Sequence, residues 1–210
     1  MSLIIEGYSI EKLIREGGFG GVYLAKKAKD RKVVAIKIMT PEAASHLKLK
    51  MQFKNEVKIL SRLDHPYIIK TYGFIPGAPR PAMSMEYFEN DTLKSLILNK
   101  SPLLEEKGLG MFRKIAEALK YLHSLKIIHK DIKPENILVS KDGDVRLIDF
   151  SIAEKIDFFS YFRRRTREGT PLYMSPEQIR RERVDCRTDI FSLGADRKST
   201  RLNSSHVSQS

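Results

Sequence analysis

The sequence predicts an α+β fold in which a β-rich first part is followed by a helix-rich second part. As far as Met39, apolar and β-branched residues alternate with polar ones, and glycine-rich or charged breaks separate the runs. Later stretches carry apolar residues at the three- and four-residue spacing of amphipathic helices. Because the two patterns are segregated along the chain, α+β fits better than a parallel sheet of alternating strands and helices.

The first part is predicted to begin with an antiparallel meander over Tyr8–Met39. An amphipathic helix over Leu47–Leu63 follows and stops at a proline. Strands over Tyr67–Phe74 and Ala82–Phe88 then flank a proline-rich turn. The change to helical patterns between Phe88 and Asp91 predicts a domain boundary, with residues 1–88 as a small N-terminal lobe.

The second part, residues 89–194, is predicted to form a larger lobe. It holds a helix over Leu109–Leu125 and a hairpin of Asn136–Val139 with Val145–Ile148, in which Gly143 occupies the turn. Residues 195–210 are serine-rich and nearly free of apolar side chains. We expect them to be a tail outside the fold, either non-native or disordered.

Composition limits the classes of partner and compartment. No stretch of about 18 apolar residues occurs, so no membrane segment is predicted. A single cysteine, Cys186, fits a reducing compartment and a cytoplasmic protein. The net charge of +12 invites a nucleic-acid partner. The basic runs Lys48–Arg62 and Arg163–Arg167 carry no interleaved aromatic platform, however, so no nucleic acid is expected. A solvated basic surface, or arginines that bind a phosphate, remain open.

A glycine-rich segment between two predicted strands is the first candidate site. Gly17, Gly18, Phe19 and Gly20 lie where a backbone can bend over a phosphate chain and offer N–H donors. An ordinary hairpin turn is the alternative.

Lys37 lies on a strand with apolar neighbours, in Val34–Lys37, and therefore needs a partner for its charge. Glu56, on the predicted helix, is the candidate counter-ion, which would orient Lys37 toward phosphate oxygens. A lysine or a glutamate alone more often faces solvent, so the pair is the specific feature.

The strongest segment is His129–Asn136, followed beyond the hairpin by Asp149–Ser151. It resembles the catalytic loop and metal-binding triplet of eukaryotic-type (Hanks-type) serine/threonine protein kinases, with the glycine loop and Lys37 in the expected order. The residues of Met174–Gln178 and Asp189–Gly194 are similar to those of bacterial members of the family. The resemblance implies a two-lobed kinase-like fold and transfer of a phosphoryl group from ATP to serine or threonine of a protein substrate, with Mg²⁺.

The resemblance also implies individual roles. Asp131 would accept or orient the substrate hydroxyl proton, and Lys133 would steady the γ-phosphate. Asn136 and Asp149 would ligate Mg²⁺ through oxygen atoms. Thr170 would contact Asp131 and Lys133, which favours Ser/Thr substrates.

Further contacts are implied around the adenine and in the core. His129 would pack on Phe150 without transferring a proton. The expected adenine contacts are the apolar walls Val22, Ala35 and Leu138, the gatekeeper Met85, and the hinge from Glu86 to Phe88. Ordinary apolar core is the alternative for the three wall residues.

Three positions depart from the kinase pattern. Arg15 replaces the first loop glycine, Ser151 replaces the glycine after Phe150, and Lys130 replaces an arginine whose planar fork grips a phosphate. They keep a second hypothesis open, namely a pseudokinase or scaffold that binds nucleotide or a partner protein without phosphoryl transfer. A basic nucleic-acid-binding module is a more distant third.

The resemblance also bears on completeness and regulation. Kinases of this family continue beyond the point that matches Gly194, and Glu177 would pair with an arginine there. We therefore expect Glu177 to be uncompensated and this stretch of chain to be marginally stable or inactive, while a full-length product could carry a membrane anchor. Ser160 and Thr166 are candidate phosphorylation sites.

Overall fold

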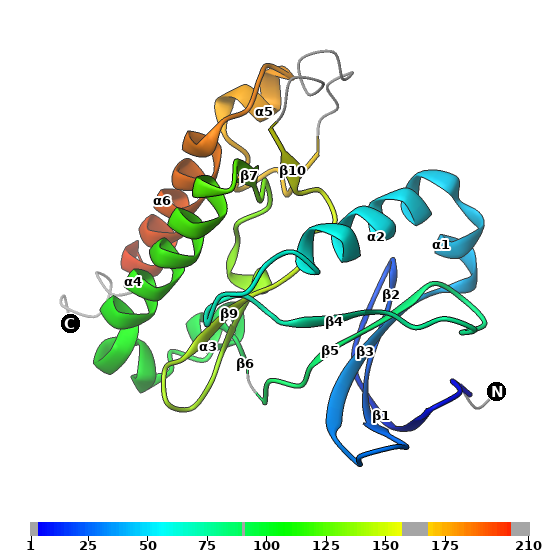
Figure 1. The fold of residues 1–210 in the computed structure, drawn as a ribbon. Coiled ribbons are helices and arrows are strands. Elements are labelled where there is room, and N and C mark those ends of the chain that lie inside the picture. Colours follow the sequence, from blue (N-terminus) through cyan, green and yellow to red (C-terminus); the bar gives the residue numbers. More distant parts are fainter. Residues whose placement is uncertain (1–3, 90, 157–167, 203–210) are drawn as a thin grey trace. The chain divides into compact units, whose positions relative to one another are not determined.

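The computed structural model describes the backbone of residues 4–89, 91–156 and 168–202, with side chains as far as residue 195 (Figure 1). The chain divides into two compact units. The first consists of Met1–His65 with Ile69–Glu89, and the second of Pro66–Ile68 with Asn90–Ser210.

The first unit is a five-stranded antiparallel sheet with two helices (Figure 1). Its strand order is β1-β2-β3-β5-β4, so the first three strands form the predicted meander. The elements are β1 (Tyr8–Gly17), β2 (Gly20–Lys27), β3 (Val33–Met39), α1 (Pro41–Ser45), α2 (Leu47–Leu60), β4 (Thr71–Phe74) and β5 (Ala82–Glu86).

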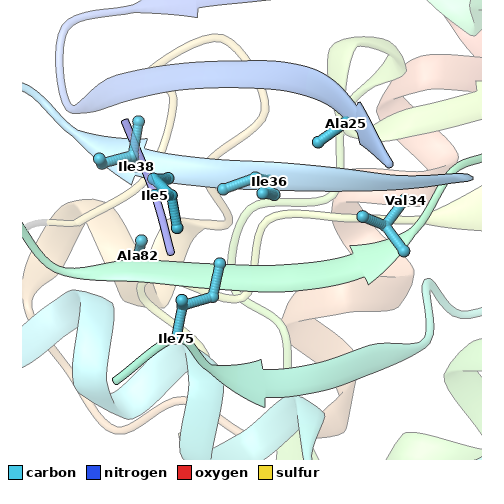
Figure 2. Close-up of a cluster of buried hydrophobic side chains, with 7 residues drawn as sticks. All are labelled: Ile5, Ala25, Val34, Ile36, Ile38, Ile75 and Ala82. Atoms are coloured by element: carbon cyan, nitrogen blue, oxygen red, sulfur yellow. The ribbon is translucent and has the colours of Figure 1, made fainter. Parts of the chain in front are cut away.

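One face of this sheet carries an apolar core (Figure 2). Because side chains alternate along a strand, Val34, Ile36 and Ile38 of β3 all face this core. Ala35 and Lys37 therefore face the opposite side of the sheet. The core is completed by Ile5, Ala25, Ile75 and Ala82.

Helix α2 has the predicted amphipathic pattern. Phe53, Val57 and Leu60 are buried at helical spacing, and Glu56 is buried among them. The helical spacing of the apolar residues therefore predicts both the helix and the face on which Glu56 lies.

The second unit is mainly helical, with two small sheets. Strands β6, β8 and β9 form one sheet, and β10 pairs with β7 in the other. In the β8–β9 hairpin, Gly143 has a φ of 77°, which explains the glycine in the turn. The elements are β6 (Asp91–Thr92), α3 (Leu93–Leu98), α4 (Pro102–Ser124), β7 (Ile127–Ile128), η1 (Pro134–Asn136), β8 (Ile137–Val139), β9 (Val145–Leu147), β10 (Glu154–Lys155), α5 (Pro176–Arg180) and α6 (Cys186–Leu202).

Several boundaries differ from those expected. Helix α4 begins at Pro102, because proline at the first helical position needs no hydrogen-bond acceptor for its nitrogen. Strand β4 begins only at Thr71, since Tyr67 and Ile68 belong to the second unit and pair with Leu147 there.

Helix α6 continues to Leu202, into the segment expected to be a tail, and residues 203–210 lie outside the described part. Within the described residues, no helix combines the length and apolar character needed to cross a bilayer.

Candidate active site

Lys37 and Glu56 form an ion pair within the first unit. The Lys37 ammonium donates to both carboxylate oxygens of Glu56, at 2.7 and 2.8 Å. The Glu56 side chain is only 2% exposed and that of Lys37 20%. A carboxylate this deeply buried needs a cation, so each side chain fixes the position of the other.

Two of the expected adenine walls, Val22 and Ala35, lie on the same face of the sheet as Lys37. Val22 is opposite Lys37 across β2 and β3, and Ala35 is opposite Met85 across β3 and β5. Glu86 ends β5, and its backbone N–H donates to the Lys70 carbonyl. Phe88 follows β5, while Leu138 lies in β8 of the second unit.

The glycine-rich segment forms the turn between β1 and β2. Gly17 pairs with Gly20 at the end of the ladder, and Gly18 and Phe19 are exposed in the turn. A Cβ at Gly20 would lie 2.2 Å from the carbonyl oxygen of Ile38, so only glycine fits there. This close approach gives Gly20 a structural role whether or not the turn binds phosphate.

In the second unit, four of the predicted side chains meet in one hydrogen-bonded cluster. One oxygen of Asp131 accepts from the backbone N–H and the hydroxyl of Thr170, at 3.0 and 2.9 Å. The other accepts from Lys133 at 2.7 Å and from the Asn136 amide at 3.0 Å. Lys133 also donates to the Thr170 hydroxyl at 2.6 Å. The Asp131 carboxylate, 12% exposed, is thereby held in one orientation.

The side-chain oxygen of Asn136 is suited to bind a cation that prefers oxygen ligands. Its amide nitrogen donates both to the backbone carbonyl and to the carboxylate of Asp131, which fixes the amide orientation. The amide oxygen is therefore the atom that can ligate an ion, and Mg²⁺ prefers such ligands. The backbone N–H of Ile148 donates to the Asn136 carbonyl at 3.0 Å, which ties the residue preceding Asp149 to this loop.

Asp149 has a φ of 64°, in the left-handed region that non-glycine residues rarely adopt. Its carboxylate accepts a long hydrogen bond of 3.4 Å from the backbone N–H of Ser151. Ser151 itself is not in the left-handed region, so a serine is sterically acceptable at this position.

His129 supports the loop that carries Asp131, and its predicted packing against Phe150 is confirmed. The two rings meet edge to face, with centroids 4.6 Å apart. The ring nitrogen Nε2 donates to the Ile148 carbonyl, while Nδ1 accepts from the backbone N–H of Asp131. Both ring nitrogens are occupied by structural bonds, which agrees with a packing role.

Asp189 is a site residue that sequence reasoning missed. Its fully buried carboxylate accepts the backbone N–H groups of His129 and Lys130, at 3.0 and 2.9 Å, and the Nε2–H of His123. It therefore anchors the loop that presents Asp131. In the sequence, Asp189 is a single acidic residue next to apolar side chains of α6. The local pattern does not indicate which groups it would bind.

A second missed residue, Gln178, joins three segments. Its side-chain amide donates to the carbonyls of Lys130 and Glu168, and it forms a capping box with Ser175 at the start of α5. Gly169, with a φ of 120°, lies against Gln178 and the Lys130 carbonyl. This packing places Thr170 beside Asp131.

The expectation that Glu177 is uncompensated is wrong. Its carboxylate accepts a hydrogen bond of 2.6 Å from the hydroxyl of Thr188, on α6. Burial raises the pKa of Glu177, but hydrogen bonds from Thr188, from its own backbone and from Ser175 outweigh burial, so the pKa lies below its ordinary value.

Arg15 lies in β1 opposite Val22, and its side chain is exposed. The candidate phosphorylation sites Ser160 and Thr166, and the arginines Arg163–Arg167, lie outside the described residues.

Comparison with known proteins identifies the family. Residues 8–196 match the family described as "Protein kinase domain". A probable serine/threonine-protein kinase of Clostridium perfringens is 34% identical over 89% of this chain, and one of Dictyostelium discoideum is 36% identical over 90%. The serine/threonine-protein kinase PknB of Mycobacterium tuberculosis is 31% identical over 92%. The chain spans 27%, 38% and 32% of these proteins, respectively. Because the family match extends over most of its length, this chain belongs to the protein kinase family.

Proposed function

We propose that this chain catalyses transfer of the γ-phosphoryl group of ATP to serine or threonine hydroxyls of a protein substrate, with Mg²⁺. The observation that carries the proposal is the cluster of Asp131, Lys133 and Thr170. The Thr170 hydroxyl donates to Asp131 and accepts from Lys133. A substrate hydroxyl needs this combination, namely a carboxylate to take its proton and a cation beside the oxygen.

Lys37 is proposed to bind the α- and β-phosphate oxygens. The ion pair with Glu56 holds its ammonium in place, and a fixed ammonium of this kind suits phosphate oxygens. The glycine turn at Gly17–Gly20 would supply backbone N–H donors to the phosphates. Val22, Ala35 and Leu138, together with the hinge from Glu86 to Phe88, are proposed as the adenine contacts.

Asn136 and Asp149 are proposed to hold Mg²⁺ through carbonyl and carboxylate oxygens. Bound Mg²⁺ supplies positive charge that offsets the negative charge on the phosphate oxygens during transfer. The chain's own contribution is to keep the two ligands in place, through the Asn136–Asp131 bonds and the backbone bond from Ile148 to Asn136.

A pseudokinase or scaffold that binds nucleotide without transferring phosphate is the second candidate. Arg15, Ser151 and Lys130 favour it, because each departs from the kinase pattern. The cluster around Asp131 opposes it, since a protein that only binds nucleotide has no need of a fixed carboxylate and ammonium beside a hydroxyl.

The test compares γ-phosphate incorporation into casein by the wild type, Asp149→Asn and Lys37→Met, with Asp142→Asn as the matched control. Asp142 is an exposed aspartate in the β8–β9 turn, so this variant makes the same chemical change away from the cluster. We expect losses of at least about 100-fold in the first two variants and none in the control. Lys37→Met leaves Glu56 buried without its cation, so thermal melting of each variant must be recorded. Equal incorporation by all four folded proteins, or none by a wild type that binds ATP, contradicts the proposal.

A further inference from the structure

We propose that Lys130, Glu154 and Glu168 form an ion triplet that fixes Thr170 beside Asp131 without phosphorylation of this chain. This inference deepens the proposed kinase function, because it concerns how that site is kept assembled. It assigns positioning roles to two glutamates that the sequence pattern did not single out.

In the triplet, one ammonium lies close to two carboxylates. The Lys130 ammonium lies 3.3 Å from a carboxylate oxygen of Glu154 and 3.5 Å from one of Glu168. The two glutamates are 14 residues apart in the sequence, at the start and the end of the segment 154–168. Both nevertheless bind the ammonium of Lys130. Lys130 immediately precedes Asp131. One side chain therefore joins both ends of the segment to the loop that carries Asp131.

The triplet is shielded from solvent. The side chain of Lys130 is 11% exposed and each glutamate side chain 20%. Charge pairs at this depth are screened less by water and salt than surface pairs, so the attraction is stronger than that of an ordinary surface ion pair.

Hydrogen bonds also hold the backbone at Lys130 and Glu168. Lys130 has a φ of 70°, its N–H donates to Asp189 and its carbonyl accepts from Gln178. The same Gln178 amide holds the Glu168 carbonyl. Two residues after Glu168, the N–H of Thr170 reaches Asp131. A displacement of Glu168 is thus transmitted directly to the contact between Thr170 and Asp131.

The chemistry of the three groups makes a phosphate unnecessary at this place. An ammonium has three donors pointing in different directions and can serve two separate carboxylates, whereas the planar fork of an arginine suits a single bidentate anion. Both carboxylates already bind the Lys130 ammonium. An added phosphate would compete with both glutamates for Lys130 and be repelled by them.

The experiment measures hydrogen exchange at the Thr170 amide and, separately, phosphoryl transfer. The variants are Glu168→Gln, Glu154→Gln and Lys130→Met, with Lys130→Arg to retain the charge and Glu182→Gln as a matched control on an exposed glutamate outside the triplet. We expect exchange at Thr170 about fivefold faster in Glu168→Gln and Lys130→Met, a smaller effect in Glu154→Gln, and wild-type exchange in the control. Transfer should fall in parallel with the loss of protection.

A second arm treats the wild type with a protein phosphatase and confirms by mass spectrometry that no phosphate remains. We expect unchanged exchange at Thr170 and an unchanged initial rate of transfer. Loss of protection after dephosphorylation, or equal exchange in Glu168→Gln and Glu182→Gln, overturns the inference. Because exchange is measured without ATP, a chain that transfers no phosphate refutes the proposed function but still tests the triplet.

Discussion

Charged side chains inside the second unit are each met by donors from a different part of the sequence. The fully buried carboxylate of Asp189 receives two backbone N–H groups and the His123 ring, and the half-buried carboxylate of Glu177 receives the Thr188 hydroxyl. An ionised carboxylate without such donors would be strongly destabilising at the depth of Asp189. These contacts therefore decide where the loop before Asp131 and the start of α5 can lie.

Two opposing influences set the pKa of Glu177. Burial alone would raise it, and the hydroxyl of Thr188 is the first of the hydrogen bonds that lower it. In Thr188→Val, which keeps the shape of this buried side chain, burial remains while that hydrogen bond is lost. We expect the pKa of Glu177, followed by NMR titration of its side-chain carboxyl, to rise above that of the wild type.

The sign of the effect on stability follows from linkage. A carboxyl whose pKa is lower in the folded state stabilises the fold above its unfolded pKa, and the contribution is lost as the pH falls through the folded pKa. Thr188→Val should therefore lose stability near neutral pH and show a weaker decline on acidification than the wild type. Thr188→Ser, which retains the hydroxyl, is the control. An unchanged pKa in the valine variant would show that the other hydrogen bonds suffice.

At the scale of elements, the helices and hairpins with strong local patterns were predictable. Helix α2 and the β8–β9 hairpin follow from apolar spacing and from a glycine in the turn, which are properties of neighbouring residues. The start of α4 and the short β4 were not predicted well. The first depends on Pro102 in the first helical turn, and the second on Tyr67 pairing with Leu147, which is distant in the sequence.

The glycine turn of the first unit allows two roles of glycine to be separated. A Cβ at Gly20 would clash with the carbonyl of Ile38, whereas a Cβ at Gly18 would meet no atom within 4 Å. Gly20→Ala should thus lower the free energy of unfolding by about 1–3 kcal/mol, because the β2–β3 ladder must open to admit the methyl group. Gly18→Ala should change it by less than about 0.5 kcal/mol.

Urea denaturation of both variants, followed by ATP titration, checks this prediction. If the turn also binds phosphate through its backbone, Gly18→Ala weakens ATP binding while leaving stability unchanged. Equal stability losses in the two variants would contradict the close approach of Gly20 to β3.

Across the whole molecule, motif-bearing residues of the site were predictable and their supports were not. Lys37 and Glu56 could be paired because one lies on an apolar strand and the other on a helix face, and both need a counter-ion. Asp189 and Gln178 act through backbone groups more than forty residues away in the sequence. Such contacts carry no local pattern, since any segment supplies N–H and carbonyl groups.

The α5–α6 region of the second unit carries exposed apolar side chains. Four large apolar side chains of the α5–α6 region, Leu172, Ile179, Ile190 and Phe191, are between 47% and 79% exposed. Hydrogen bonds from Thr188 to Glu177 and from Ser192 to the Tyr173 carbonyl hold their segments together. Exposed apolar side chains gathered in one region favour association, since contact removes them from water.

We therefore expect the isolated chain to associate as its concentration rises, in sedimentation-velocity measurements at near-physiological salt. Leu172→Gln combined with Ile190→Glu should shift the distribution toward the monomer, because both substitutions place polar groups on this surface. Leu98→Glu is the matched control, since Leu98 is 69% exposed but lies at the end of α3. A wild type that sediments as a monomer at every concentration, and melts cooperatively, would show that these side chains do not drive association. An equal shift in the control would assign the association to apolar exposure in general instead of to the α5–α6 surface.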